Sequence, residues 1–327
     1  MRNFTEFSRI AYDLGMYTLI RVADGGSSSF LKCGAVPDTL TTVDFGPTAE
    51  KNINSSFAAQ KKYLPNGHGP LVNSEFYPGW LVLWGQKSAS LPSPDEVVNS
   101  AKYMYNLGAN INFYMIHGGT NFGFWNGAET NAPGTFMHSY NGKSKRSVDL
   151  EDCNPGDVLT IFVENQGRQT YETINDYKGI LSDVELDKNV LHGWTQCKLD
   201  IIHDYADTSS SNAQGKGKYG VYHGTFKVDV PTDTFLNTTG WGKGVAVVNG
   251  NNLGRYWATE GPQLTLYVPA AFLQPGENSL LILELEGTNN CAENTCSLSL
   301  VEQPVYVWSS KKTKADFWRG PRRQQHN

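Results

Sequence analysis

The sequence has little charge and no long apolar run, and each shortage argues against a class of protein. Charged residues make up 18% of the 327 positions, and the formal net charge is −5. A nucleic-acid-binding protein needs a basic face, which this composition does not favour. No stretch reaches the ~20 consecutive apolar residues of a membrane-spanning helix. We therefore expect neither a nucleic-acid partner nor a membrane span.

Metal ligands are also scarce. The seven histidines show no metal-ligand spacing, and no Cys-x-x-Cys pair occurs, so no metal site or other cofactor is expected. Among the five cysteines, Cys291 and Cys296 bracket a short polar loop and are the best disulfide candidates. The alternative is two unpaired thiols.

Signals for secretion point in two directions. The first fourteen residues carry Glu6, Arg9 and Asp13 among their apolar residues, so no signal peptide is expected there. Three Asn-x-Ser/Thr sequons nevertheless suggest, weakly, a parent protein that passes through the secretory pathway. They begin at Asn3, Asn54 and Asn237.

Residues 1–130 alternate between helix and strand patterns. The clearest signal is Ser93-Pro94-Asp95-Glu96, where Ser93 suits an N-cap and Glu96 the capping-box position. Such alternation predicts parallel βα units, but a complete (β/α)8 TIM barrel takes roughly 250 residues. An incomplete TIM-barrel fragment is therefore expected. The expected helices span 4–14, 55–63 and 94–107, and the expected strands 17–22, 40–45, 71–74 and 111–116.

Residues 131–327 read as all-β. Short strands are punctuated by Gly, Pro, Asn and Asp, and Asn249-Gly250 is a strong hairpin signal. This pattern predicts a β-sandwich or jelly roll of one or two sub-domains, so the whole chain is classed as α/β plus all-β. The strands are expected at 157–163, 224–230, 244–248, 263–268 and 279–285, with a loop at 207–218.

One carboxylate stands out in the first region. Glu75 follows the apolar run at 71–74 and is surrounded in sequence by Phe76, Tyr77, Trp80 and Trp84. Flat aromatic faces stack on the C–H face of a pyranose, and a carboxylate attacks or stabilises an anomeric carbon. A surface glutamate beside a core aromatic cluster is the competing interpretation.

Longer runs resemble a known family, the glycoside hydrolase family 35 β-galactosidases, which include the animal lysosomal enzyme. The most specific runs are Gly-Pro-Leu-Val-Asn-Ser-Glu-Phe-Tyr at 69–77 and Tyr-Met-Ile-His-Gly-Gly-Thr-Asn-Phe-Gly at 114–123. Others are Thr-Thr-Val-Asp-Phe-Gly at 41–46 and, in the β region, Asn-Leu-Gly-Arg-Tyr-Trp at 252–257 and Gly-Pro-Gln-Leu-Thr-Leu-Tyr-Val-Pro at 261–269.

The resemblance implies roles for individual residues. Glu75 matches the catalytic nucleophile, Tyr114 a tyrosine that contacts galactose, and Trp80 a position on the aglycone side. It implies a retaining mechanism with two carboxylates roughly 5 Å apart. It also implies a galactoside substrate, a sandwich of galactose-binding type, and a lysosomal or secreted protein. The oligomeric state stays open.

The expected second carboxylate, in a Val-Glu-Asn-Glu-Tyr-Gly type segment between 22 and 40, is missing, and so are other family segments. Glu164 sits in a run that matches the sandwich, Asp95 and Glu96 suit helix capping, and Asp44 suits a strand-end hydrogen bond to backbone. His117 is adjacent to the expected site but suits an ordinary hydrogen bond. Two functions remain open: a β-galactosidase of doubtful activity, or a non-catalytic remnant whose sandwich binds carbohydrate.

Overall fold

The computed structural model divides into two compact units, each described here by itself. The first comprises Met1–Leu81 and Ser90–Gly118, and the second Val82–Ala89 and Gly119–Asn327. The structure describes residues 4–16, 31–32, 40–80, 82, 84–86, 91–116, 127–128, 130–132, 135–136, 149–150, 154–165, 168–169, 179–200, 219–292 and 295–308.

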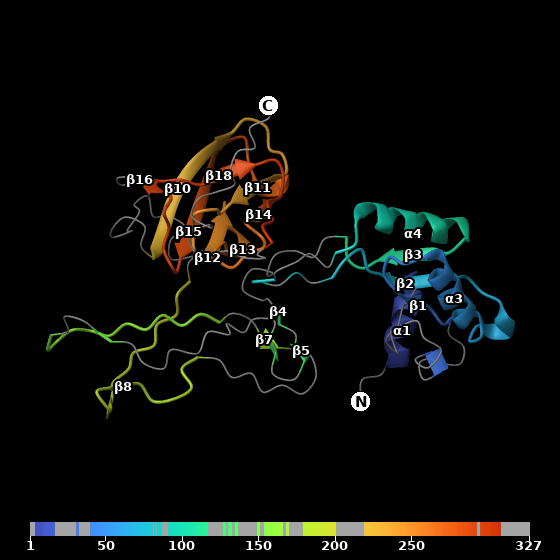
Figure 1. Ribbon diagram of the computed structural model, residues 1–327, viewed down its shortest axis with the longest axis horizontal. Helices are drawn as coiled ribbons and strands as arrows, with labels where there is room; N and C mark the ends of the chain where they lie inside the picture. The colour runs from blue at the N-terminus through green and yellow to red at the C-terminus, as the bar shows by residue number, and fades with distance from the viewer. Residues whose placement is uncertain are drawn as a thin grey trace. The chain divides into compact units, whose positions relative to one another are not determined.

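The first unit is built on a parallel three-stranded sheet in the order β1–β2–β3, with helices α3 and α4 beside it (Figure 1). Apolar side chains of both helices and of the sheet form one core, which includes Ile53, Phe57, Phe76 and Met104. The predicted alternation of strands and helices is confirmed for these elements. Their bounds are β1 Val43–Asp44, α3 Glu50–Lys61, η1 Pro65–Gly67, β2 Val72–Phe76, α4 Pro94–Asn106 and β3 Asn110–Phe113.

Helix α4 begins as its sequence predicts. The Ser93 side chain accepts from the Glu96 backbone N–H, and the Glu96 carboxylate accepts from the Ser93 N–H at 2.7 Å, which completes the capping box. The predicted apolar face is only partly right. Met104 is buried, but Val98 is 60% exposed and Tyr105 77% exposed, because the core-facing stripe of this helix is narrower than the sequence suggests.

Other boundaries in this unit differ from the prediction. The helix α1 spans Phe4–Asp13, as expected, whereas α3 starts five residues before the predicted 55–63 helix. The strands β1 and β3 are shorter than predicted, since 40–42 and 114–116 make no ladder. The predicted strand at 17–22 and the predicted loop at 207–218 lie outside the described residues.

The second unit contains an antiparallel β-sandwich (Figure 1). One sheet has the order β10–β15–β12–β13 and the other β14–β11–β18. Buried side chains from both sheets form its core, among them Tyr222, Leu236, Tyr256, Leu266 and Ile282. Strand bounds are β10 Gly220–Val228, β11 Thr234–Asn237, β12 Lys243–Val248, β13 Asn251–Trp257, β14 Thr265–Val268, β15 Gly276–Glu284 and β18 Ser299–Val301, with η2 at Ala270–Phe272.

The predicted Asn-Gly hairpin is confirmed. Asn249 and Gly250 both have positive φ, 48° and 78°, and join β12 to its antiparallel neighbour β13. Four of the five predicted all-β strands correspond to β10, β12, β14 and β15, while β11, β13 and β18 were not among the predicted strands. Gly244 on β12 is needed for close packing, because a Cβ there would lie 1.8 Å from the Leu283 carbonyl oxygen.

The predicted strand at 157–163 is wrong. Residues 154–165 are described and form no ladder, and Val158 is 87% exposed. An extended apolar segment needs a neighbouring strand for its backbone hydrogen bonds, and the described residues supply none here. The remaining ladders are short: β4 Gly127–Ala128 with β7 Arg168–Gln169, β5 Thr130–Ala132 with β6 Thr135–Phe136, and β8 Glu185–Leu186 with β9 Asn189–Val190.

A buried carboxylate organises one corner of the sandwich. Glu284, at the end of β15, is fully buried and accepts hydrogen bonds from four backbone N–H groups and from the Tyr256 hydroxyl at 2.8 Å. Burial raises the pKa of the Glu284 carboxyl, although the N–H groups of Glu286 and Gly287 oppose this shift. Burial and the Glu284 charge raise the pKa of Tyr256. Glu284 therefore connects the start of β12 with the residues that follow β15.

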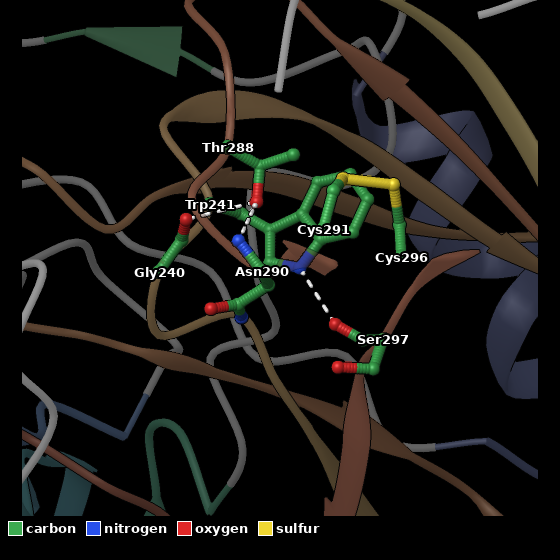
Figure 2. Close-up of a disulfide and its surroundings, with 7 residues drawn as sticks. All are labelled: Gly240, Trp241, Thr288, Asn290, Cys291, Cys296 and Ser297. Carbon is green, nitrogen blue, oxygen red and sulfur yellow. Dashed lines mark hydrogen bonds between the residues drawn. A yellow bond between two sulfur atoms is a disulfide. The ribbon is translucent and has the colours of Figure 1, made fainter. Parts of the chain in front are cut away.

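The disulfide between Cys291 and Cys296 is confirmed (Figure 2). It links the short strands β16, Cys291–Ala292, and β17, Thr295–Cys296. Both sulfur-bearing side chains pack against the core cluster that contains Trp241, whose indole N–H donates to the Ser297 carbonyl at 3.1 Å. The disulfide therefore holds Cys291 and Cys296 together against the core of the sandwich.

We expect the double substitution Cys291→Ser/Cys296→Ser to lower the free energy of unfolding of the sandwich by about 2 kcal/mol. The loop that the disulfide closes is short, so the lost restraint on the unfolded chain is at the low end of the usual range. Urea titration followed by tryptophan fluorescence measures this. The matched control is Cys197→Ser, since Cys197 is an exposed free cysteine. An equal loss in the control would contradict the expectation.

Candidate active site

Glu75 is the next-to-last residue of β2, near the carboxyl end of a central parallel strand. Asp44, on the neighbouring strand β1, is the register partner of Glu75. Tyr114 directly follows β3, and its backbone N–H donates to the Phe76 carbonyl at 2.9 Å. The carboxyl ends of parallel strands meet at one edge of a sheet, where the sites of (β/α)8 enzymes lie. The fold thus brings Asp44, Glu75 and Tyr114 to the same edge.

Tyr77 joins these residues. Its hydroxyl lies 2.5 Å from Glu75 Oε2 and 3.2 Å from Asp44 Oδ2. Its ring makes edge contacts with the rings of Tyr114, at 6.3 Å between centroids, and Trp80, at 5.5 Å. The half-buried Glu75 carboxylate therefore lies in a small cluster of aromatic rings. The Tyr77 hydroxyl contacts both this carboxylate and that of Asp44.

Two rings in this cluster are open to a ligand. Trp80 is 59% exposed and Tyr114 50% exposed. An open pocket starts at the Tyr77 and Trp80 rings and extends over the residues before and at the start of α4. It is lined by Pro47, Tyr77, Gly79, Trp80, Leu91, Pro92 and Glu96. Exposed aromatic faces beside a carboxylate suit a sugar ring, which offers both C–H and hydroxyl groups.

The aromatic patch that the sequence suggested is partly wrong. Phe76 is fully buried and packs against Phe113 at 5.3 Å, because alternate residues of a strand face opposite sides of the sheet. Trp84 belongs to the second unit and packs there near Trp257, with ring centroids 6.5 Å apart. The same alternation places Tyr77 with Glu75, a signal that sequence reasoning did not use.

Asp44 was expected to bond to backbone, and the hydroxyl of Tyr77 is the contact that this expectation missed. The register of β1 against β2 determines which side chain Asp44 meets, and this register was not readable from the sequence. His117 lies outside the described residues. Within the described segments no group of three or more His, Cys, Asp or Glu side chains is placed to hold a metal ion.

Glu164 belongs to the second unit. Its carboxylate pairs with Lys243 Nζ at 2.5 Å and with Arg255 Nε at 3.1 Å, and all three side chains are largely buried. Lys243 also lies over the Trp257 ring, 4.2 Å from its centroid. Burial lowers the pKa of Arg255, which the Glu164 charge partly offsets. A glutamate held by two cations in the sandwich has a structural role, in agreement with its sequence context.

Comparison with known proteins relates three parts of the chain to β-galactosidases. A profile of glycosyl hydrolases family 35 matches residues 15–146, which include β1, β2 and β3. The profile of a β-galactosidase first all-β domain matches 133–200, and that of a β-galactosidase galactose-binding domain matches 219–278. The three matches follow one another along the chain. Residues 15–146 are therefore similar to glycoside hydrolase family 35.

Several named proteins are similar to this chain over most of its length. It is 29% identical to proteins named Beta-galactosidase from Macaca fascicularis and Mus musculus, over 91% of the chain and 64% and 68% of those proteins. It is 26% identical to Beta-galactosidase 17 of Arabidopsis thaliana over 93% of the chain. The chain thus spans about two thirds of the length of these relatives.

The alignments also show internal gaps. The alignment with the macaque protein is 446 positions long, which exceeds the 327 residues of this chain. The relatives therefore carry internal segments that this chain lacks, as its sequence suggests. No helix in the described part of the chain is long and apolar enough to cross a membrane.

Proposed function

We propose that this chain carries the nucleophile half of a retaining β-galactosidase site that acts on terminal β-galactosyl residues of glycoconjugates. Glu75 is the nucleophile, Tyr114 contacts the galactose, and Trp80 lines the aglycone side. The observation that supports this most is the placement of Glu75 at a parallel strand end, joined through Tyr77 to the rings of Trp80 and Tyr114.

The first half-reaction follows from this geometry. A Glu75 carboxylate oxygen attacks the anomeric carbon, a glycosyl–enzyme ester forms, and the bond to the leaving-group oxygen breaks with its electron pair. The aglycone of a natural galactoside would leave as an alkoxide and therefore needs a proton at that moment. In the family a second carboxylate supplies the proton, and its segment is missing from this sequence. Chemistry is therefore expected with good leaving groups only.

The architecture proposed for residues 1–130 is an incomplete TIM barrel. Three parallel strands with the helices α3 and α4 match part of such a barrel, and the family 35 profile covers them. For residues 131–327 we propose the jelly-roll type of β-sandwich, with the galactose-binding kind of domain at 219–278. The substrate partner is then a galactoside. No metal or cofactor takes part in this scheme.

A lysosomal or secreted location is the compartment that we propose. The Cys291–Cys296 disulfide supports it, since disulfides persist in oxidising compartments. The second candidate function is a carbohydrate-binding remnant without catalysis. The match of residues 219–278 to a galactose-binding domain favours it if the barrel part proves inert.

Covalent labelling tests the assignment of Glu75. A β-galactoside with fluorine at C2 and a dinitrophenyl leaving group is expected to add one fluorogalactosyl group to the wild-type chain. Intact mass spectrometry measures the adduct, and peptide mapping locates it on Glu75. The dinitrophenolate leaves without a proton, so the missing acid does not prevent labelling.

The matched control is Glu50→Gln, which removes an exposed glutamate from the first turn of α3 and should label normally. Glu75→Gln should not label. The gluco-configured reagent should react more slowly than the galacto reagent. Absence of any adduct in the wild type, together with saturable galactose binding to the chain, would reject the enzyme in favour of the carbohydrate-binding remnant.

A further inference from the structure

The hydroxyl of Tyr77 serves two carboxylates. It contacts Glu75 Oε2 at 2.5 Å and Asp44 Oδ2 at 3.2 Å. A phenol carries one proton, whereas an ionised carboxylate only accepts. The proton is therefore shared, with the shorter and stronger hydrogen bond to Glu75. A change at Asp44 therefore alters the strength of the hydrogen bond from Tyr77 to Glu75.

The backbone holds this arrangement in place. Asp44 and Glu75 are register partners in adjacent parallel strands. The Ser74 hydroxyl bonds the Thr42 hydroxyl at 2.8 Å and donates to the Val43 carbonyl at 3.3 Å, so side chains tie β1 to β2 beside the two carboxylates. The edge contacts of the Tyr77 ring with Trp80 and Tyr114 limit the rotation of the phenol.

Asp44 is close enough to Glu75 to be considered as the acid that protonates the leaving group. Its Oδ2 lies at most about 5.7 Å from Glu75 Oε2, because both atoms contact the same Tyr77 oxygen, at 3.2 and 2.5 Å. A retaining pair stands roughly 5 Å apart. The acid and the nucleophile must flank the scissile bond, however, and here a phenol hydroxyl bridges them. The geometry therefore argues against Asp44 as proton donor to the leaving group.

We propose that Tyr77 and Asp44 are positioning residues for Glu75. Tyr77 orients the Glu75 carboxylate by hydrogen bonding, and Asp44 acts on Glu75 only through Tyr77, by competing for its proton. This inference rests on the proposed role of Glu75 as the nucleophile. It assigns Asp44 a role distinct from that of the missing acid.

Carbon-13 NMR of the full chain, labelled at the glutamate side-chain carboxyl carbon, tests the proposal without relying on activity. Glu75→Gln assigns the Glu75 signal. Tyr77→Phe removes the hydrogen bond and shifts that signal. Asp44→Asn leaves a neutral, weaker acceptor, so more of the Tyr77 proton goes to Glu75 and the signal shifts in the opposite direction. In the double variant the signal matches Tyr77→Phe alone.

The controls are Tyr105→Phe and Asp95→Asn, which change residues on the surface of α4 and should leave the Glu75 signal unmoved. An unchanged far-UV circular dichroism spectrum shows that each variant has kept its fold. The proposal would be overturned if Asp44→Asn still shifted the Glu75 signal in the Tyr77→Phe background. It would also be overturned if Asp44→Asn alone left the Glu75 signal unchanged.

The fluorosugar separates this inference from the proposed function. Tyr77→Phe should slow labelling of Glu75 by about tenfold to 100-fold, as loss of orientation does. If the wild type forms no adduct, the proposed function fails, while the NMR comparison still decides whether Asp44 acts through Tyr77. If Asp44→Asn lowers turnover of poor leaving groups alone, Asp44 is the acid and the positioning role is overturned.

Discussion

The full chain should hydrolyse a dinitrophenyl β-galactoside slowly and lactose hardly at all. General acid catalysis contributes ~10²–10⁴-fold, and only poor leaving groups need it. The chain keeps Glu75 but lacks the family segment that carries the acid. The preference for the activated substrate should therefore exceed that of a complete relative by a factor of the same order. Initial rates for both substrates, at acid and neutral pH, measure it.

Glu75→Gln should abolish the activated turnover, and Glu50→Gln should leave it unchanged. This pair separates attack by the nucleophile from a contaminating activity in the preparation. Efficient turnover of lactose that is lost in Glu75→Gln would show that another carboxyl of this chain donates the proton. The leaving-group argument would then be wrong, although Glu75 would remain the nucleophile.

Glu284→Ala should lower the free energy of unfolding of the sandwich by about 3–5 kcal/mol, the typical cost of removing one partner from a buried charged network. The carboxylate accepts from the backbone N–H groups of Gly242, Lys243, Glu286 and Gly287 and from the Tyr256 hydroxyl. Alanine leaves those donors buried without an acceptor, at about 1–3 kcal/mol each where water does not replace it. Urea titration of the full chain measures the loss.

Glu284→Gln gives a graded comparison. The amide oxygen replaces one carboxylate oxygen, while the amide nitrogen faces the Gly242 N–H, so a loss of about 1–2 kcal/mol is expected. Glu277→Ala is the matched control, because Glu277 lies on the same strand and is exposed. Equal losses for Glu277→Ala and Glu284→Ala would show that the buried network contributes nothing specific.

The strongest local signals in the sequence correspond to structure that needs few distant partners. The α4 start at Ser93 and the Asn249-Gly250 turn follow from side-chain capping and from residues that tolerate positive φ. The Cys291–Cys296 pair is close in sequence, so its pairing was also readable. The prediction at 157–163 failed because an apolar alternation specifies a strand only where a neighbouring strand exists.

In the candidate site, too, the sequence predicted the local features but not the contacts between distant residues. Sequence runs singled out Glu75, Trp80 and Tyr114, and strand alternation alone would have separated Phe76 from Tyr77. The contact of Asp44 with Tyr77 depends on how β1 is aligned with β2, which involves residues 33 positions apart. The pairing of Glu164 with Lys243 and Arg255 joins residues still further apart.

The sequence by itself determined the similarity to family 35, the change from α/β to all-β character, the disulfide and the identity of the candidate nucleophile, because these depend on local runs and residue types. Tertiary structure alone decided that Asp44 and Glu75 share the Tyr77 hydroxyl, that Trp84 packs near Trp257, and that Glu284 is buried among backbone donors. Strand register and sheet packing set those contacts, and neither is encoded in any short stretch of the chain.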